Sequence, residues 1–284
     1  MSLMKIRSLI PARLRPILRT LVGRHPPPQS PSSPFTAHNI RLDDGTETMP
    51  GHDLLMETTT WCQSAVRTLK MLYPKGLKGK RIADLGCLEG GFSVVFARLG
   101  MEVVGIEVRE SNYLNCMFVK QRTNLPNLSF VRDDAWNVGK YGPFDVIFCC
   151  GLLYHLDRPI AFIRQLSEVC TKALILNTHF ATTSPNRHHA LGDLEEYEGV
   201  QGRWMQEYDP KAVADHATLD QLKWASWSND RSFWVQREYL LEEIRAAGFP
   251  LVFEQFDAID GNIATAMLGG YYTQYERSMF VGVK

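Results

Sequence analysis

Apolar positions form a clear element pattern between residues 81 and 100. A short apolar run, residues 82–85, has the length of a buried strand and is followed by a glycine-rich stretch, residues 86–91. Apolar residues then recur at the spacing of one helix face, namely Phe92, Val95, Phe96 and Leu99. The pattern predicts a strand, a loop and a helix, with loop glycines that let backbone N–H groups approach a ligand.

The same alternation continues along the chain. Apolar runs predict further strands at 102–107, 128–132, 144–150, 173–178, 250–257 and 278–283. Helical spacing predicts helices near 91–99 and 111–122, a short one near 135–140, one that starts at Pro159, and one at 239–247. This order predicts an α/β fold, with a Rossmann-like seven-stranded, mostly parallel sheet and helices on both faces.

Two N-terminal segments lie outside this pattern. Residues 1–24 mix apolar residues with six basic residues and contain no acidic side chain. This basic amphipathic arm indicates either a tail on its own domain or a segment that binds an anionic membrane surface or a partner. Residues 25–35 are rich in proline and serine, which is typical of a linker, so the main domain is predicted at 36–284.

Residues 180–235 are predicted to be an irregular insertion after strand five. They are rich in turns and contain four of the six tryptophans. These aromatic side chains form either a core for the insertion itself or stacking surfaces for a sugar or another polyhydroxylated acceptor. Arg203, Glu207 and Asn229 are the polar candidates for substrate contacts.

Overall composition narrows the class of protein. The net charge is zero, which disfavours a nucleic-acid partner. The six cysteines lack the spacing of zinc sites, so we expect reduced thiols and no metal. No apolar run approaches the roughly 18 residues that span a bilayer, and basic residues interrupt any signal-peptide core. We therefore expect a cytoplasmic protein, with peripheral membrane contact at most through residues 1–24.

Three chemically useful features lie at the carboxyl ends of predicted strands. Residues 84–91 follow strand one, Glu107 ends strand two, and residues 133–135 follow strand three. In open α/β sheets ligands bind at this edge. A carboxylate that ends strand two can accept hydrogen bonds from both ribose hydroxyls, and an acid after strand three can accept one from an adenine amino group. The sequence therefore predicts a site for an adenosine-containing ligand.

Residues 83–90, Ala-Asp-Leu-Gly-Cys-Leu-Glu-Gly, resemble the D-x-G-x-G-x-G motif of class I S-adenosylmethionine-dependent methyltransferases. Residues 105–107, 134–135 and 144–147 match that family's later motifs in order and spacing. The resemblance covers about 81–180 and resumes at 236–284. It implies S-adenosylmethionine as cofactor and an antiparallel last strand. Leu88 replaces the middle glycine, so we expect the loop to take a different path there.

The resemblance implies a cofactor-binding set made of Asp84, Gly86, Cys87, Leu88, Gly90, Glu107, Val108, Asp134, Ala135 and Gly151. Within it, Asp84 would lie near the amino-acid part of the cofactor, Glu107 would hold the ribose, and Asp134 with Ala135 would hold the adenine. A nicotinamide dehydrogenase is disfavoured, because residues 86–91 do not supply G-x-G-x-x-G.

Methyl transfer is an in-line displacement, so the protein must align the acceptor and supply a base when the acceptor carries a proton. His155 and His179 follow strands four and five and are the candidate bases. The alternative for His155 is a structural hydrogen bond within its loop. Tyr154 is a candidate substrate contact. Residues 152–156 and Pro159 also resemble the tRNA wobble-uridine carboxymethyltransferases, a subgroup with a carboxylated cofactor.

The sequence leaves three functional hypotheses. The first is an enzyme that methylates a small-molecule or carbohydrate-like acceptor, on oxygen. The second is a tRNA-modifying methyltransferase or carboxymethyltransferase, which the zero net charge and the acidic insertion disfavour. The third is a methyltransferase-like partner subunit without turnover, an idea that depends on Leu88.

Overall fold

The structure, a computed structural model, describes residues 30–184, 188–213, 215–258, 262–269, 272 and 275–284. The predicted arm at 1–24 and the start of the linker lie outside the described residues. Ser32 and Ser33, at the end of the predicted linker, hydrogen-bond to the side chain of Asn115. The chain therefore contacts the main domain from residue 32 onward.

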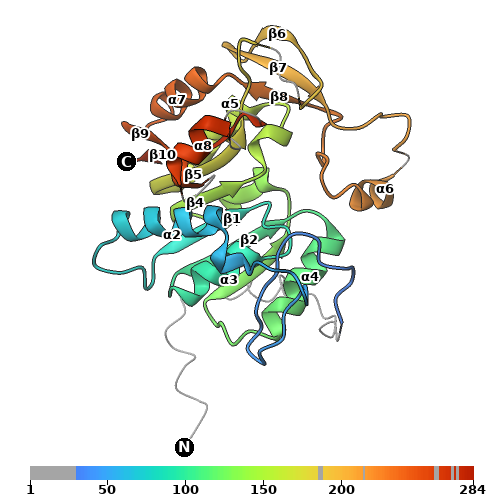
Figure 1. Ribbon diagram of the computed structural model, residues 1–284, viewed down its shortest axis with the longest axis vertical. Coiled ribbons are helices and arrows are strands. Elements are labelled where there is room, and N and C mark those ends of the chain that lie inside the picture. The colour runs from blue at the N-terminus through green and yellow to red at the C-terminus, as the bar shows by residue number, and fades with distance from the viewer. Residues whose placement is uncertain (1–29, 185–187, 214, 259–261, 270–271, 273–274) are drawn as a thin grey trace, which may run out of the picture.

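A seven-stranded sheet forms the centre of the fold (Figure 1). Its strands, in chain order, are β1 (Arg81–Leu85), β2 (Glu102–Glu107), β3 (Leu128–Arg132), β4 (Phe144–Cys150), β5 (Cys170–His179), β9 (Leu251–Gln255) and β10 (Arg277–Val283). Their spatial order is β3-β2-β1-β4-β5-β10-β9, and β10 is antiparallel to both β5 and β9. The predicted Rossmann-like sheet with an antiparallel last strand is confirmed.

Helices cover both faces of the sheet. The inner strands are therefore buried on both sides, and this is why their sequences are continuous apolar runs. The helices are α2 (Thr60–Leu72), α3 (Gly91–Arg98), α4 (Glu110–Gln121), α5 (Pro159–Val169), α7 (Arg237–Ala246) and α8 (Ile263–Gly269). Shorter 3-10 turns are η1 (Met56–Thr58), η2 (Ala135–Lys140), η3 (Leu153–His155) and η4 (Phe256–Ala258). One core lies under α2, α3 and α4, and the other lies under α5 and α7.

The insertion is more regular than predicted. It contains β6 (Leu191–Tyr197), β7 (Val200–Gln206) and β8 (Arg231–Val235), which form a three-stranded antiparallel sheet, and the short helix α6 (His216–Gln221). The prediction of an irregular insertion is wrong for these strands. β6 is exposed along most of its length and therefore lacks the apolar alternation that predicts a strand. Figure 1 shows this sheet at one end of the molecule.

Close packing at Gly105 ties the sheet to the helix after the glycine loop. A Cβ added at this β2 residue would lie 2.5 Å from the Phe130 ring and 2.9 Å from Ser93 Oγ. We predict that Gly105→Ala lowers the free energy of unfolding by about 1–3 kcal/mol, because an extra methyl forces its neighbours to move. Urea unfolding measures this change.

Gly139→Ala is the matched control for this measurement. A Cβ there would meet only Val169, at 3.8 Å, which is ordinary contact. A change below about 0.5 kcal/mol is expected for it, as for most uncrowded positions. Equal effects of the two substitutions would contradict the packing argument at Gly105.

Candidate functional site

A cavity of about 710 Å³ lies at the carboxyl ends of β1, β2, β3 and β4. It is lined by all of the predicted cofactor-binding residues except Gly90, namely Asp84, Gly86, Cys87, Leu88, Glu107, Val108, Asp134, Ala135 and Gly151. Gly90 instead packs against β3, where an added Cβ would lie 2.7 Å from the Phe130 ring. The structure thus brings together residues that are up to 67 positions apart in the chain.

The glycine loop keeps its tight turn despite Leu88. Gly86, Leu88 and Gly90 have φ angles of 62°, 52° and 81°, all in the left-handed region that glycine favours. Leu88 therefore has the backbone conformation that a glycine would adopt there, and the departure from the motif appears as strain of about 1–2 kcal/mol. The Leu88 N–H donates to Glu107 Oε2 at 2.9 Å, which holds this conformation in place.

Two buried carboxylates form the floor of the cavity. Glu107 accepts hydrogen bonds from the backbone N–H groups of Leu88 and Arg109, both at 2.9 Å. Asp84 accepts one from Ser93 Oγ at 2.6 Å. Burial nevertheless raises the pKa of each carboxyl to about 7. A ligand that donates hydrogen bonds or brings positive charge would stabilise the ionised forms.

A third buried carboxylate, Glu89, joins the N-terminal segment to this loop. Glu89 is fully buried and accepts from the backbone N–H groups of residues 36, 37 and 38 at 2.8–3.2 Å. His38 Nδ1 in turn accepts from the Gly91 N–H at 3.0 Å, at the start of α3. Burial lowers the pKa of His38 to about 4, so this histidine is neutral. Sequence reasoning missed both residues, because their partners lie about 50 positions away.

Residues 219–229 of the insertion cover the cavity. The Arg109 guanidinium donates to the carbonyls of Leu219 and Ala225, the latter at 2.6 Å, and its carbon lies 5.2 Å from the centre of the Trp227 ring. Lys223 Nζ lies 3.7 Å from the Glu89 carboxylate. Arg109 was not predicted as a site residue. The sequence feature that could have indicated Arg109 is its position just after the end of β2.

His155 forms a buried pair with Glu207. His155 Nδ1 lies 3.0 and 2.9 Å from the two Glu207 carboxylate oxygens, and the Glu207 side chain is only 1% exposed. Glu207 also accepts from the Ser226 N–H at 2.9 Å, so it links the histidine to residues 219–229. His155 and Tyr154 line the cavity. Among the described residues, Nε2 of His155 has no hydrogen-bond partner.

Glu207, predicted as a substrate contact, is not among the residues that line the cavity, and neither are the other predicted catalytic and substrate residues, His179, Arg203 and Asn229. His179 stacks on Trp234 at 4.7 Å between ring centres, and its Nδ1 donates to the Tyr275 carbonyl at 2.7 Å. Burial and then the Arg277 charge lower the pKa of His179 to about 3. The Arg203 guanidinium donates to three backbone carbonyls. Asn229 donates to the carbonyls of residues 155 and 231. Within the described chain these three side chains hold protein groups in place.

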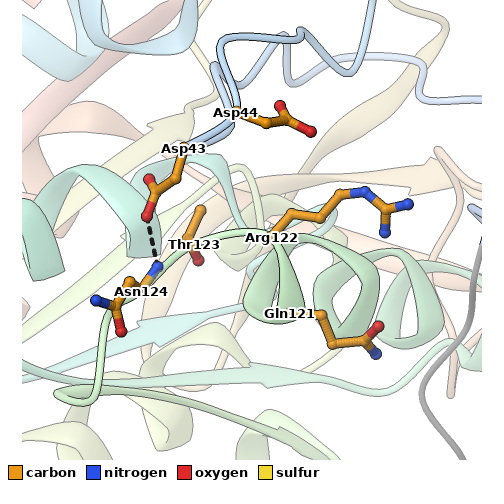
Figure 2. A pocket seen from close by; sticks show the side chains of 6 residues that line it. All are labelled: Asp43, Asp44, Gln121, Arg122, Thr123 and Asn124. Atoms are coloured by element: carbon orange, nitrogen blue, oxygen red, sulfur yellow. Dashed lines mark hydrogen bonds between the residues drawn. The ribbon is translucent and has the colours of Figure 1, made fainter.

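A second pocket, of about 360 Å³, is a shallow surface pocket that is open to solvent (Figure 2). It lies between the turn at Asp43 and Asp44 and the end of α4, and Asp43 accepts from the Asn124 N–H at 2.6 Å. It contains none of the predicted site residues.

In the described part of the chain, no helix is long and apolar enough to cross a membrane.

Comparison with known proteins gives two kinds of match. Residues 59–253 match the model of a methyltransferase domain family. A tRNA U34 carboxymethyltransferase of Campylobacter lari is 29% identical over 102 residues, which are 35% of this chain and 35% of that protein. A ubiquinone biosynthesis O-methyltransferase of Psychrobacter arcticus is 30% identical over 102 residues, 35% of this chain and 38% of that protein. The matched segment thus spans little more than a third of these relatives.

The N-terminal domain of EvdMO1, crystallised in the presence of SAH and D-fucose, has a similar fold over almost the whole chain. The TM-score is 0.61 at 21% sequence identity, and the match covers 97% of this chain and 98% of that one. The order of the strands and the match to the family model both indicate a methyltransferase domain. The family model covers more than half of the chain, so the chain belongs to the methyltransferase domain family, and its fold is that of the class I S-adenosylmethionine-dependent methyltransferases.

Proposed function

We propose that this chain transfers a methyl group from S-adenosylmethionine to an oxygen atom of a small, carbohydrate-like acceptor. The observation that carries the proposal is the His155–Glu207 pair at 2.9 Å, placed on the wall of a cavity whose floor carries the cofactor motif. The donor supplies an electrophilic methyl group on a sulfonium. The residues of the chain have to hold the donor, orient the acceptor and remove its proton.

The residues on the floor of the cavity suit the parts of the donor. Glu107, at the end of β2, can accept hydrogen bonds from ribose hydroxyls, and Asp134, after β3, can accept one from an adenine amino group. Asp84 and the backbone of residues 86–88 would lie beside the amino-acid part. Nine of the ten residues that the motifs indicate line this cavity, and this supports their assignment as the cofactor site.

His155 suits the role of general base. A carboxylate on Nδ1 favours the tautomer with the proton on that nitrogen, which leaves Nε2 to accept a proton from an acceptor hydroxyl. Glu207 then also stabilises the imidazolium that forms. His179 suits a supporting role, because its Nδ1 is held by a carbonyl and it is not among the residues that line the cavity. Tyr154 lines the wall beside His155 and is the substrate contact in this proposal.

The covering segment favours a small acceptor over an RNA. Residues 219–229 are held over the cavity by Arg109, Glu207 and Lys223, so an RNA would have to displace them. The related fold of EvdMO1 was crystallised with a sugar and SAH, which is consistent with a carbohydrate-like acceptor. A ubiquinone biosynthesis O-methyltransferase among the relatives is consistent with transfer to oxygen.

The ribose role predicts the effect of a change at Glu107. Glu107→Gln should weaken S-adenosylhomocysteine binding by about 1–2 kcal/mol, because one charged hydrogen-bond acceptor is lost. Isothermal titration calorimetry measures it. Glu102→Ala, at the exposed opposite end of β2, should leave the affinity unchanged. Unchanged affinity in Glu107→Gln would remove Glu107 from the site.

The raised pKa values predict a pH dependence of binding. Asp84 and Glu107 have pKa values of about 7 in the free protein, and the ligand favours their ionised forms. Affinity for S-adenosylhomocysteine should therefore be full above pH 8 and fall by about tenfold per carboxyl for each pH unit below 7. Titrations from pH 6 to 9 test this, and Glu107→Gln should show a shallower decline. A constant affinity from pH 6 to 8 would contradict the prediction.

The base role predicts a specific loss of turnover. His155→Asn should lower the rate of methyl transfer by about 10²–10⁴-fold, since proton removal contributes that much, and should leave S-adenosylhomocysteine affinity within threefold. The readout is S-adenosylhomocysteine production over a panel of hydroxylated sugars and phenols. His52→Asn, at an exposed histidine, is the matched control. Wild-type protein that binds the cofactor but methylates no member of the panel would instead support a partner subunit without turnover.

A further inference from the structure

Arg277, the first residue of β10, is a buried cation on the cavity wall. Its side chain lines the cavity, and the residue is only 8% exposed. The motifs did not indicate it, and nothing in the proposed proton transfer uses it. A guanidinium this deeply buried needs compensation, because burial of an unpaired charge costs several kcal/mol.

The protein holds this guanidinium firmly. Nε donates to Asn177 Oδ1 at 2.7 Å, and Asn177, on β5, is itself only 1% exposed. The guanidinium carbon lies 4.3 Å from the centre of the Trp61 ring and 5.4 Å from that of Tyr154. A Cβ added at Gly151 would lie 3.5 Å from Nη2, so the fork lies close over the end of β4. Both rings and Gly151 also line the cavity.

The guanidinium lacks an anionic partner among the described residues. No carboxylate in the described part of the chain lies within 4.0 Å of it, whereas the half-buried Arg237, at the start of α7, is paired with Glu254 at 2.5 Å. Glu276, the adjacent residue, accepts a hydrogen bond from Thr182 Oγ1 at 2.6 Å. The neighbours of Arg277 are instead neutral groups: burial and then the Arg277 charge lower the pKa of the His179 imidazole, and burial raises the pKa of the Cys150 thiol although the Arg277 charge opposes that rise. Its charge is therefore compensated only by neutral groups and ring faces.

The sheet order places Arg277 at the acceptor end of the cavity. Glu107 on β2 and Asp134 after β3 lie on one side of β1. On the other side, Gly151 follows β4, and Asn177 and Arg277 belong to β5 and β10. The donor nucleoside suits the first side. His155, the proposed base, comes from the loop after β4 and shares the second side with Arg277.

We propose that Arg277 binds a carboxylate of the acceptor, so that the substrate is a hydroxylated acid such as a uronic acid or a hydroxybenzoate. This inference rests on the proposed function and names its substrate class. With Nε held by Asn177, the terminal nitrogens can exchange their weak contact with the Cys150 thiol for a carboxylate, which a guanidinium fork binds with two parallel hydrogen bonds. The rings of Trp61 and Tyr154 flank the same position and suit the apolar face of a sugar or phenol ring.

Matched acid and neutral probes test the proposal. Protein saturated with S-adenosylhomocysteine is titrated with D-glucuronate against D-glucose, and with 3,4-dihydroxybenzoate against its amide. In the wild type we expect the acid of at least one pair to bind tenfold or more tightly than its neutral partner. In Arg277→Gln this ratio should fall to about one, and in Arg277→Lys it should fall only in part. Arg231→Gln, at an exposed arginine that lies 4.2 Å from the centre of the Trp204 ring, should keep the wild-type ratio.

A second variant avoids removal of the arginine. Asn177→Asp would place a carboxylate beside Nε and compete with the acid, so it should also lower the ratio while the chain keeps Arg277. Equal binding of acid and neutral probes by the wild type, or binding of neither, would overturn the proposal. The ratio must also respond to both variants, since a merely structural Arg277 would change the melting temperature without changing the preference for acids.

Two further outcomes would mean that Arg277 binds a carboxylate of the methyl donor and not one of the acceptor. Either would also overturn the proposal. The first is a loss of more than tenfold in S-adenosylhomocysteine affinity in Arg277→Gln, which would mean that the guanidinium holds the amino-acid carboxylate of the donor. The second is a wild-type preference for a carboxylated S-adenosylmethionine that disappears in the variant. Failure of methyl transfer itself would be seen separately, as absent S-adenosylhomocysteine production, because these titrations measure binding alone.

Discussion

The site depends on the placement of the buried Glu107 carboxylate at the end of β2. Its oxygens accept from the backbone N–H groups of Leu88 and Arg109, so one side chain fixes both the glycine loop and the start of the segment after β2. This bond also holds Leu88 in a left-handed conformation that a side chain disfavours. Burial raises the pKa of Glu107 to about 7 and leaves it ready for a ligand that favours the ionised form.

The segments that cover the cavity are held by the same kind of contact as the Glu107 loop: a charged side chain forms hydrogen bonds with backbone groups of a segment distant in sequence. Glu89 holds residues 36–38, and Arg109 holds the carbonyls of residues 219 and 225. Glu207 joins this cover to His155. The N-terminal segment, which precedes β1, and the insertion, which lies between β5 and β9, therefore both contribute to the wall of one cavity.

The two sides of β1 carry different chemistry. On the side of β2 and β3 the cavity presents carboxylates, which suit hydroxyl and amino donors of a nucleoside. On the side of β4, β5 and β10 it presents a histidine, two aromatic rings and a buried guanidinium. This division arises from the sheet order, in which β10 lies between β5 and β9 and brings a residue near the C-terminus beside the end of β4.

The sequence by itself determined the main sheet, most of the helices that connect its strands, and the floor of the cavity. Buried parallel strands are apolar runs in the sequence, and the motif residues follow strands whose carboxyl ends meet at one edge of the sheet. The sequence did not reveal β6, whose exposed strand lacks apolar alternation, and it predicted Arg203 and Asn229 as substrate contacts although both hold protein groups. Only the tertiary structure decided that Glu207 orients His155, that His179 lies in an aromatic cluster, and that Arg277 reaches the cavity. Each of these depends on contacts between residues that lie about 50 to 100 or more positions apart, such as His155 with Glu207 (52) and Arg277 with Asn177 (100), for which local periodicity carries no signal.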